Sequence, residues 1–164
     1  MHKKLIYQLV YLVAIFSLIL IFSSTTYAAT LTLTPSSQNI SVGQTFSVDI
    51  NLNTQGVAID GVDVYSLRYN PAILEVQDSN VSVSGIQISP GTLLANTLTN
   101  AVNALNGTIQ LSQVTTGGTT YTGSGKLATV VFKAKVVGIS PVAFDFILGS
   151  TSDTNVAGGG QDKL

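Results

Sequence analysis

The sequence predicts an all-β domain built as an antiparallel β-sandwich of about eight strands. Three observations carry this prediction. Beyond residue 28 the chain is rich in Val and Thr and is punctuated by Gly and Asn, which is typical of strands joined by turns. Several segments alternate apolar and polar residues with a period of two, and none after residue 28 shows a convincing 3.6-residue period. Evenly spaced short strands favour two packed sheets.

A hydrophobic signal segment precedes this domain. Lys3 and Lys4 come before an apolar run over residues 5–22, and a small-x-small pattern ends at Ala28. This order predicts a secretory signal peptide, residues 1–28, cut after Ala28. The run is almost long enough to cross a bilayer, so an uncleaved N-terminal membrane anchor is the alternative. In both cases we expect residues 29–164 to be secreted, extracellular or at the cell surface.

The first two predicted strands cover residues 31–34 and 46–52. The first is short, alternates Leu with Thr, and ends at Pro35, as an edge strand does. The second has the clearest alternation in the chain, which indicates a half-buried strand. Its predicted inner face consists of Phe46, Val48, Ile50 and Leu52.

The third predicted strand covers residues 62–69, and Asn70-Pro71 ends it with turn chemistry. We expect its inner face to carry Tyr65, Leu67 and Tyr69, and its outer face Val64, Ser66 and Arg68. Asp63 would then fall on the inner face, which predicts a bulge or a shift in pairing there. A fourth strand begins at residues 73–76.

The second half contains at least four further strands. Residues 93–99 fit a strand or a short helix, and we prefer the strand. Asn106-Gly107 is the strongest hairpin signal in the sequence and leads into residues 108–114. Further strands are predicted over residues 127–137 and 142–148, and the Gly-rich tail at 157–160 is expected to be flexible. The inner face of the longer one comprises Ala128, Val130, Phe132, Ala134 and Val136.

The composition argues against several functions. Without Lys3 and Lys4, five of the seven basic residues remain against eight acidic ones, a net charge of −3 that gives no case for nucleic-acid binding. The chain has no cysteine, and its one histidine, His2, lies in the signal segment, so neither a Ser-His-Asp site nor a His/Cys zinc site is available. One glutamate excludes a Glu/Glu pair for glycoside hydrolysis. We therefore predict that the chain is not an enzyme and needs no cofactor.

Two weaker sites stay open. Asp153, Asn155 and Asp162 offer oxygen ligands for calcium in a Gly-rich region, although short polar side chains there more often bond nearby backbone. Tyr121 lies in a Gly/Thr loop and could stack on a sugar, although a single loop tyrosine and the absence of Trp make a poor carbohydrate platform.

Several segments resemble a cohesin domain. The run Val-Asp-Val-Tyr-Ser-Leu-Arg-Tyr-Asn-Pro-Ala-Ile-Leu-Glu-Val over 62–76 is similar to the cohesin strand that ends in Tyr-Asp-Pro-x-x-Leu-Glu-Val. Ser-Val-Gly-Gln-Thr-Phe at 41–46, Asn-Gly-Thr-Ile at 106–109 and Gly-Lys-Leu-Ala-Thr-Val-Val-Phe-Lys at 125–133 resemble other cohesin segments, in family order. The resemblance implies a nine-stranded jelly-roll sandwich that binds a dockerin, a small calcium-loaded helical protein, in cellulosome-like, polysaccharide-degrading assemblies.

The resemblance also implies a partner-binding face made by the third, fifth, sixth and eighth strands. Mapped by strand, that face is expected to carry Val64, Ser66, Arg68, Asn96, Thr97, Thr108, Gln110, Ser112, Thr129, Val131 and Lys133. The outward Val64 and Val131 would supply an apolar centre inside a polar rim. Each of these positions could equally be an ordinary solvated strand residue.

Two departures from the family pattern bear on these expectations. Asn70 stands where cohesins usually have Asp, and no segment after Leu164 supplies the last strand, which in the family pairs near the first. We therefore expect residues 29–164 to form a cohesin-like domain that lacks its last strand. The alternatives are a carbohydrate-binding or adhesive module of the same sandwich superfamily, and a structural repeat in a surface stalk.

Overall fold

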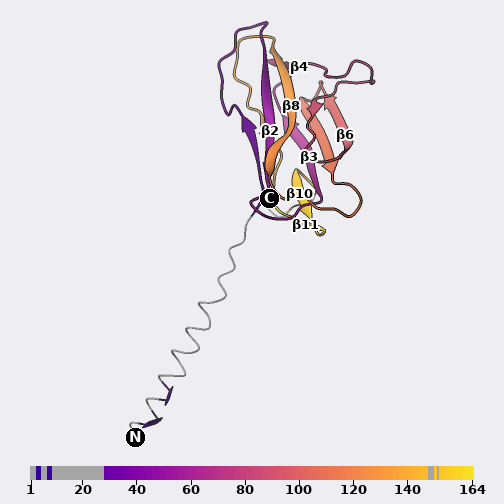
Figure 1. Ribbon diagram of the computed structural model, residues 1–164. Coiled ribbons are helices and arrows are strands. Elements are labelled where there is room, and N and C mark those ends of the chain that lie inside the picture. Colours follow the sequence, from indigo (N-terminus) through magenta and orange to yellow (C-terminus); the bar gives the residue numbers. More distant parts are fainter. Residues whose placement is uncertain (1–2, 5–6, 9–27, 148–149, 151) are drawn as a thin grey trace.

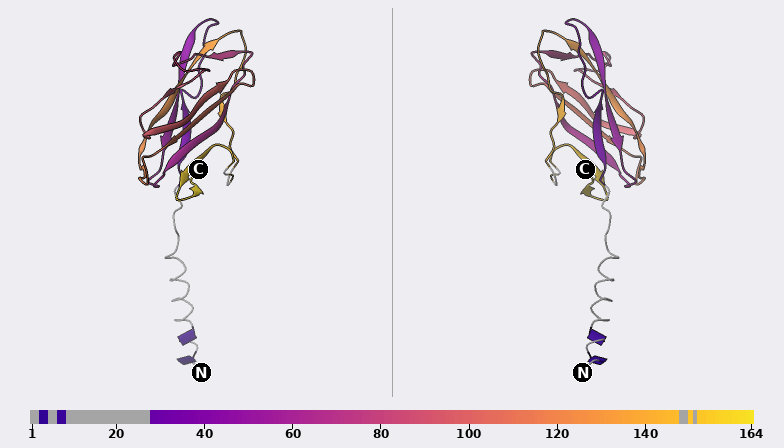
Figure 2. Two further views of the ribbon diagram at one scale, coloured as in Figure 1. Left: turned by 90° about the vertical axis from the view of Figure 1, so that its right-hand side faces the viewer. Right: turned by 90° about the vertical axis from the view of Figure 1, so that its left-hand side faces the viewer.

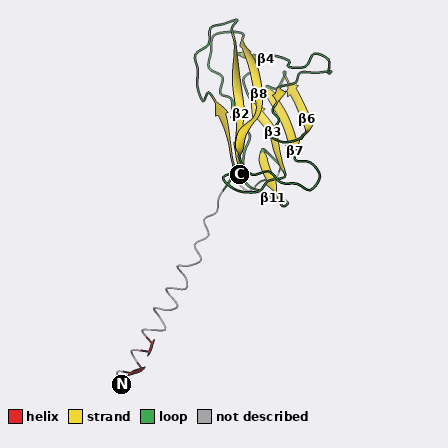
Figure 3. Cartoon of the chain, in the orientation of Figure 1, coloured by secondary structure: helices red, strands yellow, loops and turns green. Residues whose placement is uncertain are grey.

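The computed structural model describes residues 3–4, 7–8, 28–147, 150 and 152–164 (Figure 1). The predicted signal segment lies almost wholly outside these residues, so its role and its cleavage stay predictions. Among the described residues, no helix has the length and apolar character needed to cross a membrane. From residue 28 onward the described chain consists of strands and loops (Figure 3).

Two antiparallel sheets form the domain, which confirms the predicted jelly-roll sandwich. The first sheet has the order β1-β2-β8-β4, with β5 also paired to β8, and the second has the order β11-β10-β3-β7-β6, with β9 also paired to β3. The strands are β1 (Thr30–Thr34), β2 (Thr45–Asn53), β3 (Gly61–Arg68), β4 (Leu74–Val76), β5 (Ser89–Pro90), β6 (Asn96–Asn103), β7 (Thr108–Val114), β8 (Ser124–Ala134), β9 (Ala143–Phe144), β10 (Asn155–Gly158) and β11 (Gln161–Asp162). The described strands exceed the expected number because β5, β9 and β11 are two-residue segments.

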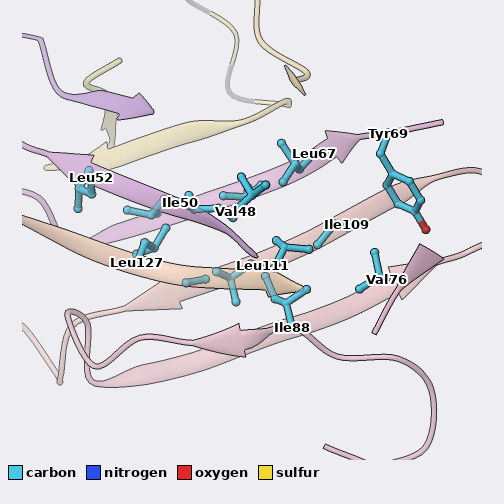
Figure 4. Close-up of a cluster of buried hydrophobic side chains, with 14 of the residues drawn as sticks. Val48, Ile50, Leu52, Leu67, Tyr69, Val76, Ile88, Ile109, Leu111 and Leu127 are labelled. Carbon is cyan, nitrogen blue, oxygen red and sulfur yellow. The ribbon is translucent and has the colours of Figure 1, made fainter. Parts of the chain in front are cut away.

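The core lies between the two sheets, where the alternating apolar residues of the strands meet. Figure 4 shows side chains of β2 and β8 facing those of β3 and β7. At its centre Phe132 is fully buried, and its ring lies 5.6 Å from that of Phe46 and 5.4 Å from that of Tyr69. Full burial of a side chain of this size contributes roughly 2–3 kcal/mol.

Four predictions from the sequence need correction. The segment predicted at 93–99 begins three residues later, as β6, and only residues 143–144 of the predicted strand at 142–148 pair as a strand, β9, while position 148 lies outside the described residues. Val136, expected inside, is 51% exposed because β8 ends at Ala134. The tail expected to be flexible instead pairs with β3 as β10 and turns through Gly159-Gly160 into β11.

The C-terminal segment meets the start of β1 at one pole of the domain. The backbone N–H of Ala29 donates to the carbonyl of Lys163, with a nitrogen-to-oxygen distance of 2.6 Å, so residue 163 lies beside the start of β1 (Figure 1). Whether the family's last strand is missing, and where the domain ends, stay predictions. Figure 2 shows the same arrangement from two further sides, with the strands running along the long axis of the domain.

Candidate functional face

A β-bulge in β3 decides which of its residues face outward. The register with β7 runs from Asp63 opposite Ser112 to Val64 opposite Leu111, then shifts before Leu67 pairs with Ile109. A bulge places two residues of one strand against one of the other and so changes the alternation. As a result Val64 and Leu67 both point into the core.

The bulge overturns two predictions for the binding face. Val64 is fully buried and Ser66 is 5% exposed, so neither lies on the outer surface. Tyr65, expected inside, is 49% exposed. The alternation of Val62 with Val64, both apolar, is the signal that could have placed Asp63 and Tyr65 outside, but the stronger aromatic pattern of Tyr65, Leu67 and Tyr69 masked it.

The predicted residues on β8 lie on the other side of the molecule. Thr129, Val131 and Lys133 belong to β8, which pairs with β2 and β4 in the first sheet. The sheet that contains β8 and β2 packs against the one that contains β3 (Figure 1). The outward side chains of β8 therefore face away from those of β3 and β7. The sheet that holds β3, β6 and β7 is completed by β9 and β10 instead. The single eleven-residue face predicted from the sequence is therefore wrong as one surface.

The outer face of the second sheet, from β10 through β3 and β7 to β6, is called the β3 face below. It keeps Arg68, Thr108, Gln110 and Ser112 of the predicted set, because these alternate with buried neighbours on β3 and β7. Thr108 lies directly opposite Arg68, and Gln110 lies opposite Ala101 of β6. The outward side chains of β7 here are uncharged and polar.

The predicted residues of β6 lie at the edge of the same sheet. Asn96 is exposed and its side-chain nitrogen donates to the carbonyl of Thr115 at 3.4 Å. The Thr97 hydroxyl accepts a hydrogen bond from the Gln113 side chain at 3.0 Å, and the ladder between β6 and β7 shifts register directly after it. Thr97 itself is exposed, so this hydrogen bond joins an exposed side chain of β6 to the buried Gln113.

Charge on the β3 face is sparse. Arg68 and Asp145 form an ion pair, with Nη2 2.7 Å from Oδ2. Asp63 lies two positions before Tyr65, and burial raises the pKa of its carboxyl above the ordinary value of 3.8. The face therefore combines one exposed aromatic ring, one neutralised ion pair and one separate carboxylate.

The calcium candidates do not converge among the described residues. The Asp162 carboxylate accepts hydrogen bonds from the backbone N–H groups of Val156 and Leu164 at 3.2 and 3.1 Å, and the Asn155 amide donates to the carbonyl of Asp153 at 3.1 Å. These are the local backbone bonds that short polar side chains make in turns. Asp153 is buried, and one of its oxygens accepts from the backbone N–H of Ile147. The part of the chain that is described holds no group of three or more acidic, His or Cys side chains suited to a metal, and calcium binding stays a prediction.

Tyr121 is half-buried rather than presented to solvent. Its side chain packs against the core, and its backbone pairs with that of Ile59. A sugar ring needs an open aromatic face, which this packing restricts. The carbohydrate alternative therefore gains no support from the position of Tyr121 and stays a prediction.

Two packed antiparallel sheets, with an exposed tyrosine on one polar outer face, define a β-sandwich domain. Comparison with known families narrows the class of protein to one family: the cohesin domain family matches residues 29–160. The chain belongs to the cohesin domain family. A comparison with curated proteins found no match.

Solved structures support the fold. A type II cohesin in a complex described as cohesin-X-dockerin from Acetivibrio cellulolyticus is similar with a TM-score of 0.60 and 19% identity, covering 85% of this chain and 91% of that chain. The cohesin CaCohA2 from Clostridium acetobutylicum has a TM-score of 0.61 and 16% identity, covering 85% of each chain. A type I cohesin from Pseudobacteroides cellulosolvens has a TM-score of 0.53 and 21% identity, covering 71% of this chain and 75% of that chain.

Proposed function

We propose that this domain is a non-catalytic, extracellular or cell-surface module that binds a dockerin. Membership of the cohesin family supports the proposal, as does the absence of an acid–base or nucleophilic group set in the sequence beyond residue 28. Structures of similar cohesins are described as complexes with dockerins. A polysaccharide-degrading or cell-surface assembly is the setting that this partner implies.

The β3 face is the binding surface in this proposal. The observation that carries it is the exposed Tyr65 on the central strand of a sheet whose neighbouring side chains, such as Gln110, are polar and uncharged. Interfaces place aromatic anchors at a desolvated centre and polar groups around them. The outer face of the first sheet differs, because its described ion pair joins Lys126 to Asp49 and Lys133 adds a further positive charge.

The test is binding of the exported chain to dockerin-bearing proteins encoded in the same genome, in calcium-containing buffer. Gln110→Arg places a long charged side chain on the β3 face and is expected to abolish capture. Ser47→Arg is the matched control, because Ser47 is exposed on β2 of the opposite sheet. If no dockerin is captured by the unchanged chain, or if both variants lose binding equally, the proposal fails.

A further inference from the structure

Two exposed apolar loops cover the end of the domain that lies away from Ala29. β1 and β8 end at this pole and β2 begins there (Figure 1). The two loops, residues 35–44 and 136–142, are called the distal pole below. On the second loop Val137 is 92% exposed and Ile139 is 87% exposed. Exposed aliphatic side chains that gather in one place mark an interaction surface.

A cavity of about 920 Å³ opens between these two loops. Val48 and Leu74, two buried residues of the core, form part of its lining. The loop at 136–142 contributes an aliphatic wall that includes Val136 and Ile139. The loop at 35–44 contributes a wall of small polar side chains, which are Ser36, Ser37, Gln38, Asn39 and Ser41. The cavity is large enough to receive several side chains of a partner.

Backbone hydrogen bonds fix the bases of both loops. The N–H of Gly43 donates to the carbonyl of Ala134 at 2.8 Å, which holds the first loop against the end of β8. The N–H of Lys135 donates to the carbonyl of Ile73 at 2.8 Å, at the start of the second loop. A partner therefore meets a preformed cavity, and little ordering of the backbone is needed for binding.

The distal pole contains no charged residue. The nearest charges in the chain lie at its base, where Lys135 donates to the carbonyl of Pro71 and Lys133 lies opposite Glu75. A nucleic acid or a charged peptide finds no opposite charge to pair with here. Beyond residue 28 the chain has five basic and eight acidic residues, so two copies repel each other over most of their surfaces. At the distal pole they can meet without bringing like charges together.

The distal pole also carries both halves of a self-complementary contact. Val137 and Ile139 stand clear of the fold at the rim, and the cavity lies beside them. In a two-fold contact the same surface pairs with itself, so each copy can insert these side chains into the cavity of the other. We propose that the distal pole joins two copies of the domain end to end. The β3 face lies along the strands rather than at their ends, so both β3 faces stay open in such a pair.

Sedimentation equilibrium of the exported chain, over concentrations up to about 1 mM, tests the proposal. The mean mass of the unchanged chain should rise toward twice that of the monomer. Ile139→Asp places a charge in an apolar contact, and Ser41→Arg places one in the cavity, so each variant alone should stay monomeric. Val81→Asp is the matched control, because Val81 is 88% exposed on the loop between β4 and β5, away from the cavity. It should associate as the unchanged chain does.

A mixture of Ile139→Asp and Ser41→Arg gives the sharpest result. In a mixed pair, Asp at position 139 of one copy meets Arg at position 41 of the other, and the second knob and cavity keep their original residues. The mixture should therefore regain association that neither variant shows alone. A mixture that stays monomeric overturns the insertion of one copy into the other.

Three further outcomes would overturn the inference. They are an unchanged chain that stays monomeric throughout, an Ile139→Asp variant that associates normally, and a Val81→Asp variant that loses association equally. Dockerin capture by Ile139→Asp should match that of the unchanged chain, because the distal pole is separate from the β3 face. Loss of capture would place the distal pole in the dockerin contact and also overturn the inference, whereas the proposed function is tested by the unchanged chain alone.

Discussion

Arg68 at the end of β3 and Asp145 just after β9 are joined across the sheet by an ion pair in which Nη2 lies 2.7 Å from Oδ2. The backbone ties the same two segments, because the N–H of Asp145 donates to the carbonyl of Ser66 at 2.8 Å. The ion pair therefore adds a second contact between β3 and the segment after β9, which the backbone hydrogen bond already joins. The ion pair also neutralises the charge of Arg68, which is the one arginine of the chain and lies on the β3 face.

Replacing Arg68 by Met should change the free energy of unfolding by no more than about 1 kcal/mol, because the pair is largely solvated. Urea denaturation measures the change, with Arg68→Lys as the control that keeps the charge. A loss above about 2 kcal/mol would show that the pair is far better shielded than its exposure indicates.

Phe132→Ala should destabilise the domain by about 3–5 kcal/mol, because Phe132 is fully buried and loses its contacts with Phe46 and Tyr69. The denaturation midpoint reports the change. Val131→Ala, one residue earlier on the outer side of β8, should cost no more than about 1 kcal/mol. Equal effects of the two variants would contradict the assigned orientation of β8.

Gly107→Ala should destabilise the hairpin between β6 and β7. Gly107 has φ +67°, and an added Cβ would lie 2.2 Å from the carbonyl oxygen of Tyr69. The strained backbone alone costs about 1–3 kcal/mol, and the clash adds to it. Thermal unfolding measures the loss, and Asn106→Ala, whose side chain is exposed, serves as the control. A neutral Gly107→Ala variant would argue against this close approach.

Ser66→Ala should leave the free energy of unfolding unchanged or raise it by up to about 1 kcal/mol, because the buried Ser66 hydroxyl has no hydrogen-bond partner among the described residues. Dockerin binding should also be unaffected, since Ser66 does not reach the β3 face. Urea denaturation and the binding assay check the two parts. A clear loss in either would mean that this hydroxyl has a partner or a contact.

The Asp63→Asn variant should be more stable than the wild type at neutral pH. Burial raises the folded-state pKa of Asp63 above the unfolded value of 3.8, so the ionised carboxylate destabilises the folded state at every pH above the folded pKa. That penalty disappears as the pH falls through the folded pKa toward 3.8, and the two proteins should then converge. Unfolding measured from about pH 7 to about pH 3 tests the sign. A difference that grows on acidification would contradict it.

The sequence allowed the strands to be predicted where alternation is uninterrupted. Val48, Ile50 and Leu52 of β2 are buried as expected, and so are Val130 and Phe132 of β8, because one side of each strand meets the opposite sheet. Asp63 correctly signalled an irregularity in β3. Alternation could not locate the bulge between Val64 and Leu67, and a one-residue error there exchanges the two faces of the strand.

The candidate binding face was harder to predict because sheet membership depends on long-range pairing. Nothing local to Thr129 or Lys133 indicates that β8 pairs with β2 rather than β3. The prediction of a flexible Gly-rich tail was wrong for a related reason. Val156 is fully buried and pairs with Val62 of β3, so tertiary contacts order a segment whose composition suggests a loop. Tyr65 and Asp145 could therefore be placed on the β3 face only from the fold.

The hydrogen bond between Ala29 and Lys163 has a practical consequence for engineering. Because the backbone of residue 29 lies next to that of residue 163, the segment between them is suited to transplantation into an exposed loop of a carrier protein without stretching either junction. A carrier loop has to bridge only the gap between two neighbouring backbone segments. Several copies set into one scaffold would each display the tyrosine-bearing surface to the surroundings, as an array of capture sites at a chosen spacing.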